Sequence, residues 1–311
     1  MTIKYEYDKS AMTAEIVGVD DCGTNVVIPA TVEYYKKVYK VTTIGKKAFF
    51  ECKALENIVI PNNVTNIEEY AFSRCESLAS IEIPKSVVRI HECAFTFCES
   101  LNSIKVDSGN TVYDSRDNCN AIIETQTNTL ICGGNMTVIP NSVTSIGDKA
   151  FCGCSGLTSI EIPNSVTNIG SSAFFWCQGL THVVIGENVT SIGDSAFQHC
   201  SVLTRVVIPN SITSIESRTF CGCTRLTGIE IPNSVTNIGS DAFKYCSRLT
   251  SIEIPNSVTN IGSDAFYGCS SLKRVKIYNK KDKITINDSA FPTDNVVEFV
   301  GSSWWRKILH Q

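Results

Sequence analysis

Cysteine offers the widest choice of chemistry in this chain, because thiols can act as nucleophiles, bind metals or form disulfides. The sequence contains 15 cysteines, and nine of them follow a phenylalanine by three residues: Cys52, Cys75, Cys98, Cys154, Cys177, Cys200, Cys223, Cys246 and Cys269. Equivalent side chains on stacked coils would lie about 5 Å apart with parallel Cβ vectors, whereas a disulfide needs Cβ atoms about 3.8 Å apart. We therefore expect a column of buried, unpaired thiols that act as small hydrophobic groups.

Two other patterns resemble metal sites. Cys152-Gly153-Cys154 and Cys221-Gly222-Cys223 have the form of chelating pairs, but they lie three coils apart, about 15 Å along the stack. The second cysteine of each pair also belongs to the buried column. Glu230 and Glu253 would lie about 5 Å apart on one face and could attract a cation, although like charges on a solvated face usually only repel weakly. We expect no metal site and no cofactor.

Catalytic residues are not grouped in the sequence. The four histidines, His91, His182, His199 and His310, fall in different repeats, and none has a nucleophile and a carboxylate placed consistently around it. The chain contains no phosphate loop, dinucleotide fingerprint, G-x-S-x-G or H-E-x-x-H motif. The sequence therefore predicts a protein that is not an enzyme and has no catalytic residues.

A period of 23 residues organises the chain. It is carried by phenylalanines in one repeated context: Phe49, Phe72, Phe95, Phe151, Phe174, Phe197, Phe220, Phe243, Phe266 and Phe291. A fixed period of about 20 to 29 residues with L-x-x-I-x-I is typical of a leucine-rich-repeat solenoid. We expect stacked parallel β-strands, short turns or 3₁₀ or helical segments on the other side, and caps at both ends.

Each column of the repeat has an expected position. In the strand, Ile160 and Ile162 point inward and Glu161 points outward, because side chains alternate along a strand. Ala-Phe-x-x-Cys, as at Phe174 and Cys177, is expected to form a short helical or 3₁₀ turn. The Val-x-x-Ile segment on the opposite wall has apolar residues three apart, which favours a tighter extended or turn-like segment over a second flat strand.

One continuous domain is predicted over residues 1–311. It comprises an N-terminal β cap (1–40), repeats (41–106), an insertion (107–139), further repeats (140–291) and a C-terminal cap (292–311) that includes Trp304 and Trp305. Phe95 and Phe151 are 56 residues apart, one period of 23 plus 33. Within the insertion, apolar stretches at 121–124 and 129–132 flank a polar segment and indicate a hairpin.

Bulk properties narrow the classes of partner. The net charge is −4 and no basic block is present, so nucleic acid is not an expected partner. No apolar run approaches the roughly 18 residues of a transmembrane helix. The first ten residues contain no apolar core of a signal peptide. Nothing in the sequence indicates an oligomeric state.

The repeated unit I-P-x-S-V-T-x-I-G-x-x-A-F-x-x-C-x-x-L, found from about Pro61 to Phe291, resembles the BspA-like leucine-rich repeat proteins of bacterial surfaces. The segment Tyr113–Ile131 is similar to an inserted unit common in that family. The resemblance implies a secreted or cell-surface protein, since several members are described as adhesins that bind host matrix or other cells. Because so many thiols suit a reducing compartment, an intracellular scaffold with a reduced cysteine ladder is the alternative.

Candidate binding residues lie where outward positions depart from the repeat. On the outward strand face, His182, Val184, Arg205 and Val207 interrupt a Ser/Glu pattern between Glu161 and Glu230. An apolar centre with a charged rim is typical of protein-binding surfaces. The alternative is random drift on a solvated face, where valine is simply a good strand former.

A second candidate is an aromatic edge in the two positions after each repeat phenylalanine. Its members are Phe97, Phe175, Trp176, Tyr245 and Tyr267. Exposed rings there would suit contact with protein or sugar. The alternative is that they pack over neighbouring turns as a second layer.

Overall fold

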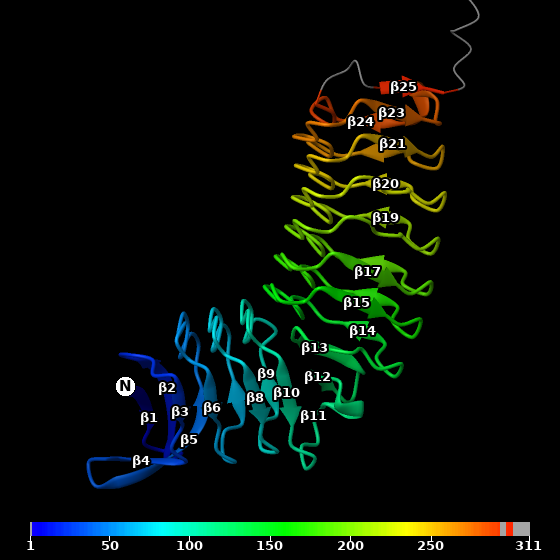
Figure 1. Cartoon of the computed structure of the whole chain (residues 1–311). Coiled ribbons are helices and arrows are strands. Elements are labelled where there is room, and N and C mark those ends of the chain that lie inside the picture. The colour runs from blue at the N-terminus through cyan, green and yellow to red at the C-terminus, as the bar shows by residue number, and fades with distance from the viewer. Residues whose placement is uncertain (1, 293–296, 301–311) are drawn as a thin grey trace, which may run out of the picture. The chain divides into compact units, whose positions relative to one another are not determined.

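The computed structural model describes residues 2–292 and 297–300. Contacts between Cα atoms divide the chain into two compact units, residues 1–158 and 159–311. Each unit is a coiled β-solenoid whose successive turns place short strands side by side (Figure 1). This confirms the predicted leucine-rich-repeat solenoid. In the described part of the chain, no helix has the length and hydrophobicity needed to span a membrane.

Up to residue 106 of the first unit, the strands of successive coils form two sheets. One sheet has the order β1–β2–β5–β7–β9 with β4 on β5, and the other has the order β10–β8–β6–β3. Their bounds are β1 Ile3–Asp8, β2 Thr13–Val19, β3 Asn25–Val27, β4 Thr31–Tyr34, β5 Lys37–Ile44, β6 Asn57–Val59, β7 Asn66–Ile67, β8 Ser80–Ile83, β9 Arg89–Ile90 and β10 Ser103–Val106. The pairs β1/β2 and β4/β5 are antiparallel, whereas the strands of the repeats pair in parallel.

Residues 107–139 contain the antiparallel strands β11 (Tyr113–Asp114), β12 (Ala121–Glu124) and β13 (Thr129–Gly133), with the short 3₁₀ helix η1 (Arg116–Asn118) between the first two. β13 pairs in parallel with β14 (Ser145–Ile146). Gly133 takes the place of the missing phenylalanine, because its N–H donates to the carbonyl of Ala150 as the repeat phenylalanines do to the next coil. A Cβ there would overlap the ring of Phe151.

In the second unit, the repeat strands pair in parallel along two walls. The outward wall contains β15–β17 and β21–β23–β25, and the opposite wall contains β16–β18 and β19–β20–β22–β24. Their bounds are β15 Ser159–Ile162, β16 Asn168–Ile169, β17 His182–Ile185, β18 Ser191–Ile192, β19 Ser214–Ile215, β20 Asn237–Ile238, β21 Ser251–Ile254, β22 Asn260–Ile261, β23 Arg274–Ile277, β24 Thr285–Ile286 and β25 Val297–Phe299. The 3₁₀ helix η2 (Lys281–Lys283) precedes β24.

The core consists of columns of identical residues, as the period predicts. In the second unit, the rings of Phe197, Phe220 and Phe243 are fully buried and stack at centroid distances of 5.7 and 5.5 Å, nearly parallel. In the first unit, Phe49 and Phe72 stack in the same way at 5.3 Å. A one-residue change of period would break these contacts along the whole column.

The segment around each phenylalanine is a hydrogen-bonded turn and not a helix. N–H groups alternate between carbonyls of their own turn, such as Cys52 N to Phe49 O, and carbonyls of the next coil, such as Phe49 N to Ala71 O. The residue two after each repeat phenylalanine from Phe49 to Phe266 has positive φ, as at Trp176 with φ 61°. A left-handed residue ends a helix, so of the expected alternatives the short turn is the one formed.

Of the alternatives expected for the opposite wall, the extended segment is the one formed, but the expectation that it would not be a strand was wrong. The Val-x-x-Ile segments do not form isolated turns, because their Asn-Ile or Ser-Ile pairs make two-residue strands such as β16 and β18. These strands pair in parallel from coil to coil. A second, narrow sheet therefore closes the solenoid opposite the outward wall.

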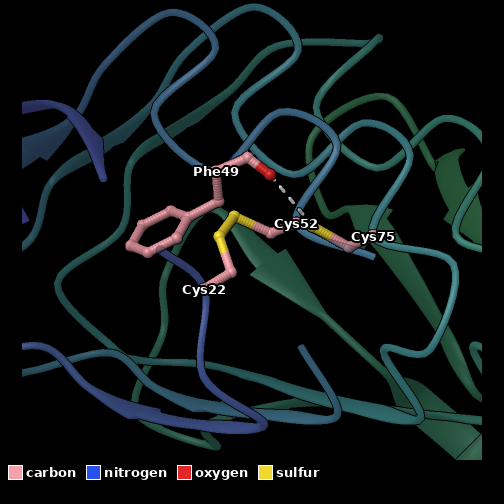
Figure 2. The surroundings of a disulfide bond; sticks show 4 residues. All are labelled: Cys22, Phe49, Cys52 and Cys75. Atoms are coloured by element: carbon pink, nitrogen blue, oxygen red, sulfur yellow. Dashed lines mark hydrogen bonds between the residues drawn. A yellow bond between two sulfur atoms is a disulfide. The ribbon is translucent and has the colours of Figure 1, made fainter. Parts of the chain in front are cut away.

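The cysteine column needs one correction. Cys75 Sγ donates to the carbonyl oxygen of Phe49 in the preceding coil at 3.2 Å, and the thiols of Cys98, Cys200, Cys223, Cys246 and Cys269 repeat this contact. Cys52 lies in the first phenylalanine coil and forms a disulfide with Cys22 (Figure 2). The expectation of a free thiol was wrong here because Cys22 comes from outside the column, with a Cα–Cα separation of 5.4 Å.

Part of the expected C-terminal cap, including Trp304 and Trp305, lies outside the described residues. Before it, β25 pairs in parallel with β23. The division of the chain into one solenoid with these caps stays a prediction.

Candidate protein-binding face

The outward wall of the second unit places the predicted binding residues in two neighbouring rows. In one row, Glu161 pairs with Val184 and Val207 pairs with Glu230. In the other, His182 pairs with Arg205. We call His182, Val184, Arg205 and Val207, with Glu161 and Glu230 at the rim, the valine patch. The columns of the repeat thus bring together the six residues chosen on the outward strand face.

The valine patch is exposed. Val184 is 45% exposed and Val207 is 62% exposed, whereas the residues directly before them, Val183 and Val206, are each 3% exposed. The four charged or polar members are also exposed. Solvated valines beside charged groups give this part of the wall an apolar centre and a polar border.

The outward wall is less regular between β17 and β21. In the described chain, the segments 205–208 and 228–231 contain only isolated bridges, and no bridge joins 228–231 to β21. An open groove of ≈ 880 Å³ lies here, bordered by Arg205, Val207, Glu230 and Glu253. Gly228 opens its floor, because a Cβ at this position would meet no atom within 4 Å. The valine patch therefore borders a groove.

The charged residues around the groove differ in whether they are paired within the chain. Glu253 accepts hydrogen bonds from Lys276 Nζ at 2.9 Å and Tyr278 Oη at 3.0 Å, which lower the pKa of Glu253. Within the described residues, the side chains of Arg205 and Glu230 form no ion pair. Both charges remain available to a partner at the edge of Val207.

The first part of the aromatic edge is packed onto neighbouring turns. The Phe97 ring lies 5.1 Å from the Arg74 guanidinium. Phe97 also packs closely on Gly153, where a Cβ would lie 2.5 Å from Phe97 Cα. Gly222 is packed in the same way against the ring of His199. In the two Cys-Gly-Cys patterns, Gly153 and Gly222 thus adopt the left-handed conformation, with φ of 79° and 75°. The ring of the neighbouring Phe97 or His199 packs against each glycine.

The remaining aromatic residues form two clusters in the second unit. The rings of Phe175 and Trp176 contact His199 at 5.9 and 4.5 Å, and burial lowers the pKa of His199. Tyr245 and Tyr267 meet edge to face at 5.8 Å, and each is 48% exposed. The aromatic edge is therefore mainly a second packing layer, with these two tyrosines as its most exposed part.

Lysine and aspartate side chains fix the tyrosine pair. Lys244 Nζ lies 5.8 and 5.3 Å from the two ring centroids. The same ammonium contacts Asp241 at 2.8 Å and Asp264 at 2.9 Å. These contacts engage the charges near the tyrosines within the chain.

Two features of the structure were not predicted from the sequence. The groove at Gly228 had a signal, since glycine stands there in a column of Ser, His and Arg. The positive φ of the position two after phenylalanine also had a signal, since Gly153, Gly222 and Gly268 all occupy it. The described residues contain no group of three His, Cys, Asp or Glu side chains that could hold a metal ion.

Comparison with known proteins identifies the family of the repeat. The family described as "BspA type Leucine rich repeat region" matches residues 28–129, 131–247 and 190–308. A leucine-rich repeat protein from Bacteroides ovatus is 30% identical, with 96% of this chain and 70% of that chain covered and a TM-score of 0.63. No curated protein sequence matches.

Two more distant solved structures share the fold. A leucine-rich repeat protein from Eubacterium ventriosum is 20% identical, with 97% of this chain and 95% of that chain covered and a TM-score of 0.67. The pneumococcal vaccine antigen PcpA is 20% identical, with 96% and 91% covered and a TM-score of 0.58. From the period, the columns and the matched residues, the chain belongs to the BspA-type leucine-rich repeat family.

Proposed function

We propose that this chain is a non-enzymatic protein-recognition module of the cell surface or the secreted fraction, and that it binds its partner through the valine patch. The observation that carries the proposal is the pair of exposed valines, Val184 and Val207, adjacent in one row and bordered by Glu161 and Glu230. Leucine-rich repeats generally serve as protein-interaction modules, and a solenoid offers an extended surface for contact.

The groove at Gly228 also supports partner binding on this face. A partner side chain seated above Gly228 would contact Val207 and remove it from water. Arg205 and Glu230 would then meet opposite charges of the partner at the border. Affinity would come from many shallow contacts around a small apolar centre.

The proposed location rests on the family and on the Cys22–Cys52 disulfide. Disulfides persist in oxidising compartments and are rare in the cytosol. The buried column thiols do not favour the alternative of an intracellular scaffold, because burial raises their pKa and keeps them unreactive in either compartment. At Cys75 and Cys200, burial raises the pKa to about 12.

A double substitution tests the valine patch. Val184→Glu/Val207→Glu places two carboxylates at the apolar centre, and we expect at least a ~10-fold loss of affinity for the partner. Binding is measured by surface plasmon resonance against purified extracellular-matrix proteins (collagens, laminin and fibronectin). A parallel pull-down from cytosol of the source organism tests the scaffold alternative.

The chain offers a matched control in its first unit. Val27 and Val59 are 68% and 57% exposed and pair in register on adjacent strands, so Val27→Glu/Val59→Glu changes the same chemistry at another site. Matrix binding that survives in this control and is lost in the patch variant supports the proposal. Equal binding by the patch variant and the unsubstituted protein would remove the valine patch as the binding site. Capture of cytosolic proteins only would reject the surface location.

A further inference from the structure

The outward wall of the second unit is parted at one level. Residues 228–231 share a single bridge with the preceding coil, between Val207 and Glu230, and in the described chain no bridge joins them to β21. β21 itself pairs with β23 over four residues. The opposite wall stays paired at this level, because β20 and β22 are parallel neighbours (Figure 1). The opening is therefore confined to the outward wall.

Main-chain groups at this opening have no partner. In a regular coil, the inward residue of the strand bonds to the next coil, as Ile254 C=O accepts from Tyr278 N–H at 2.9 Å. Ile229 is such an inward residue, yet its N–H and C=O form no hydrogen bond with the described part of the chain. At Ile231 the equivalent donor would be Pro255, which has no N–H. The opening therefore leaves strand groups that the chain does not satisfy.

The groove at Gly228 gives a ligand access to these groups. Its lining includes the inward residues Ile229, Ile231 and Ile252, so the groove passes between the two coils. Ile229 and Ile231 are each 8% exposed, whereas Ile254 in the regular strand is fully buried. The volume of ≈ 880 Å³ is typical of ligand sites. A chain that supplied hydrogen bonds to Ile229 would remove the cost of leaving its main chain unpaired.

The rim of the groove selects the side chains of such a ligand. Glu230 lies in the middle of the parted segment, and its exposed carboxylate forms no ion pair with the described residues. Glu253 on the next coil already accepts a hydrogen bond from Lys276 at 2.9 Å. A cation of the ligand would therefore be attracted mainly to Glu230. On the other side of the parted segment, the exposed Val207 offers an apolar contact.

We propose that this groove binds an extended segment of the protein partner by main-chain hydrogen bonds, with a lysine or arginine side chain at Glu230 and an apolar side chain above Gly228, beside Val207. The inference rests on the proposed function, because it names the part of the partner that the valine patch holds. In an antiparallel arrangement, one residue of the segment accepts from Ile229 N–H and donates to Ile229 C=O. A strand inside the partner's own sheet has these groups engaged, so the segment is a loop or a chain terminus.

Matched peptides test the main-chain contact. The probe is acetyl-Val-Thr-Lys-Thr-Val-amide, in which the lysine and both valines share one face when the chain is extended. The second peptide is the same sequence N-methylated at each residue, which removes its main-chain donors. Binding to the full ¹⁵N-labelled chain is followed by NMR at the amide signal of Ile229.

We expect saturable binding of the unmodified peptide that shifts the Ile229 amide signal, and an affinity at least about tenfold lower for the N-methylated peptide. Equal affinity of the two peptides would overturn the proposal. So would the absence of any shift at Ile229 with the unmodified peptide at about 5 mM, the weakest binding that such a titration detects.

The variant Glu230→Gln tests the charge. It keeps the shape of the side chain, and we expect affinity for the lysine peptide to fall about threefold, as for an exposed ion pair. Replacing the lysine of the peptide by glutamine should then cause no further loss. Glu82→Gln is the control, because Glu82 occupies the same column in the first unit and is exposed. Equal effects of the two variants would reject the role of Glu230.

The peptide results and the test of the proposed function fail separately. Matrix capture that is lost in Val184→Glu/Val207→Glu, without peptide binding at Ile229, would support the valine patch and reject the extended segment. Peptide binding at Ile229, with matrix capture unchanged in the same variant, would support the groove and reject the valine patch as the matrix site.

Discussion

Removing one ring from the interior of the phenylalanine column should cost more than removing one from its end. Phe220 is fully buried and stacks on Phe197 and Phe243 at 5.7 and 5.5 Å. Phe291 is half-buried and stacks on Phe266 at 5.1 Å. Both substitutions lie in the second unit and remove the same atoms. The difference between their losses of stability therefore reflects the position of each ring in the column.

The magnitude follows from burial and stacking. Truncation of a buried phenylalanine to alanine costs about 3–5 kcal/mol, and each aromatic pair contributes about 0.5–1.5 kcal/mol beyond burial. Phe220→Ala loses full burial and two pairs, so we expect a loss of about 4–5 kcal/mol. Phe291→Ala loses partial burial and one pair, for which we expect about 2 kcal/mol.

Equilibrium urea unfolding followed by circular dichroism measures both values, from the shift of the midpoint and the slope. Equal losses in the two variants, or a larger loss in Phe291→Ala, would refute the idea that identical repeat residues stabilise one another as a column. A change of slope would instead indicate that the units no longer unfold together.

Two further predictions concern single residues of the second unit. Gly222→Ala should lower the free energy of unfolding by about 1–2 kcal/mol, because φ is 75° and an added Cβ would overlap the ring of His199. Gly228→Ala should change it by less than about 0.5 kcal/mol, because a Cβ there would point into open space. Thermal melts compare the two variants. Burial lowers the pKa of His199, so the unfolded chain binds its proton first as pH falls. The contribution of neutral His199 to the free energy of unfolding is therefore complete at pH values above the pKa of the unfolded state, about 6.5, and decreases as the pH falls below it. His199→Asn should flatten that slope in urea titrations between pH 7 and pH 5; an unchanged slope would contradict this account.

The repeat columns could be predicted because each comes from a short local pattern that recurs every 23 residues. Ile160 and Ile162 are two residues apart, as inward positions of a strand must be, and the spacing of 23 places their equivalents on top of one another. For the same reason Glu161, Val184, Val207 and Glu230 could be assigned to one outward row before any coordinates were known. Whether a partner uses that row is not encoded in the period, because outward positions do not affect packing.

Contacts outside the period could not be predicted. Cys52 belongs to the column by sequence, yet the N-terminal segment brings Cys22 to it. Cys93 and Lys149 meet because the insertion lengthens one side of the solenoid and bypasses the turn. Repetition of local sequence sets the fold, since each 23-residue unit buries the same apolar face on the next. Only the path of the chain in three dimensions decides which non-repeated residues meet, because those distances depend on how the insertion and the N-terminal segment pack.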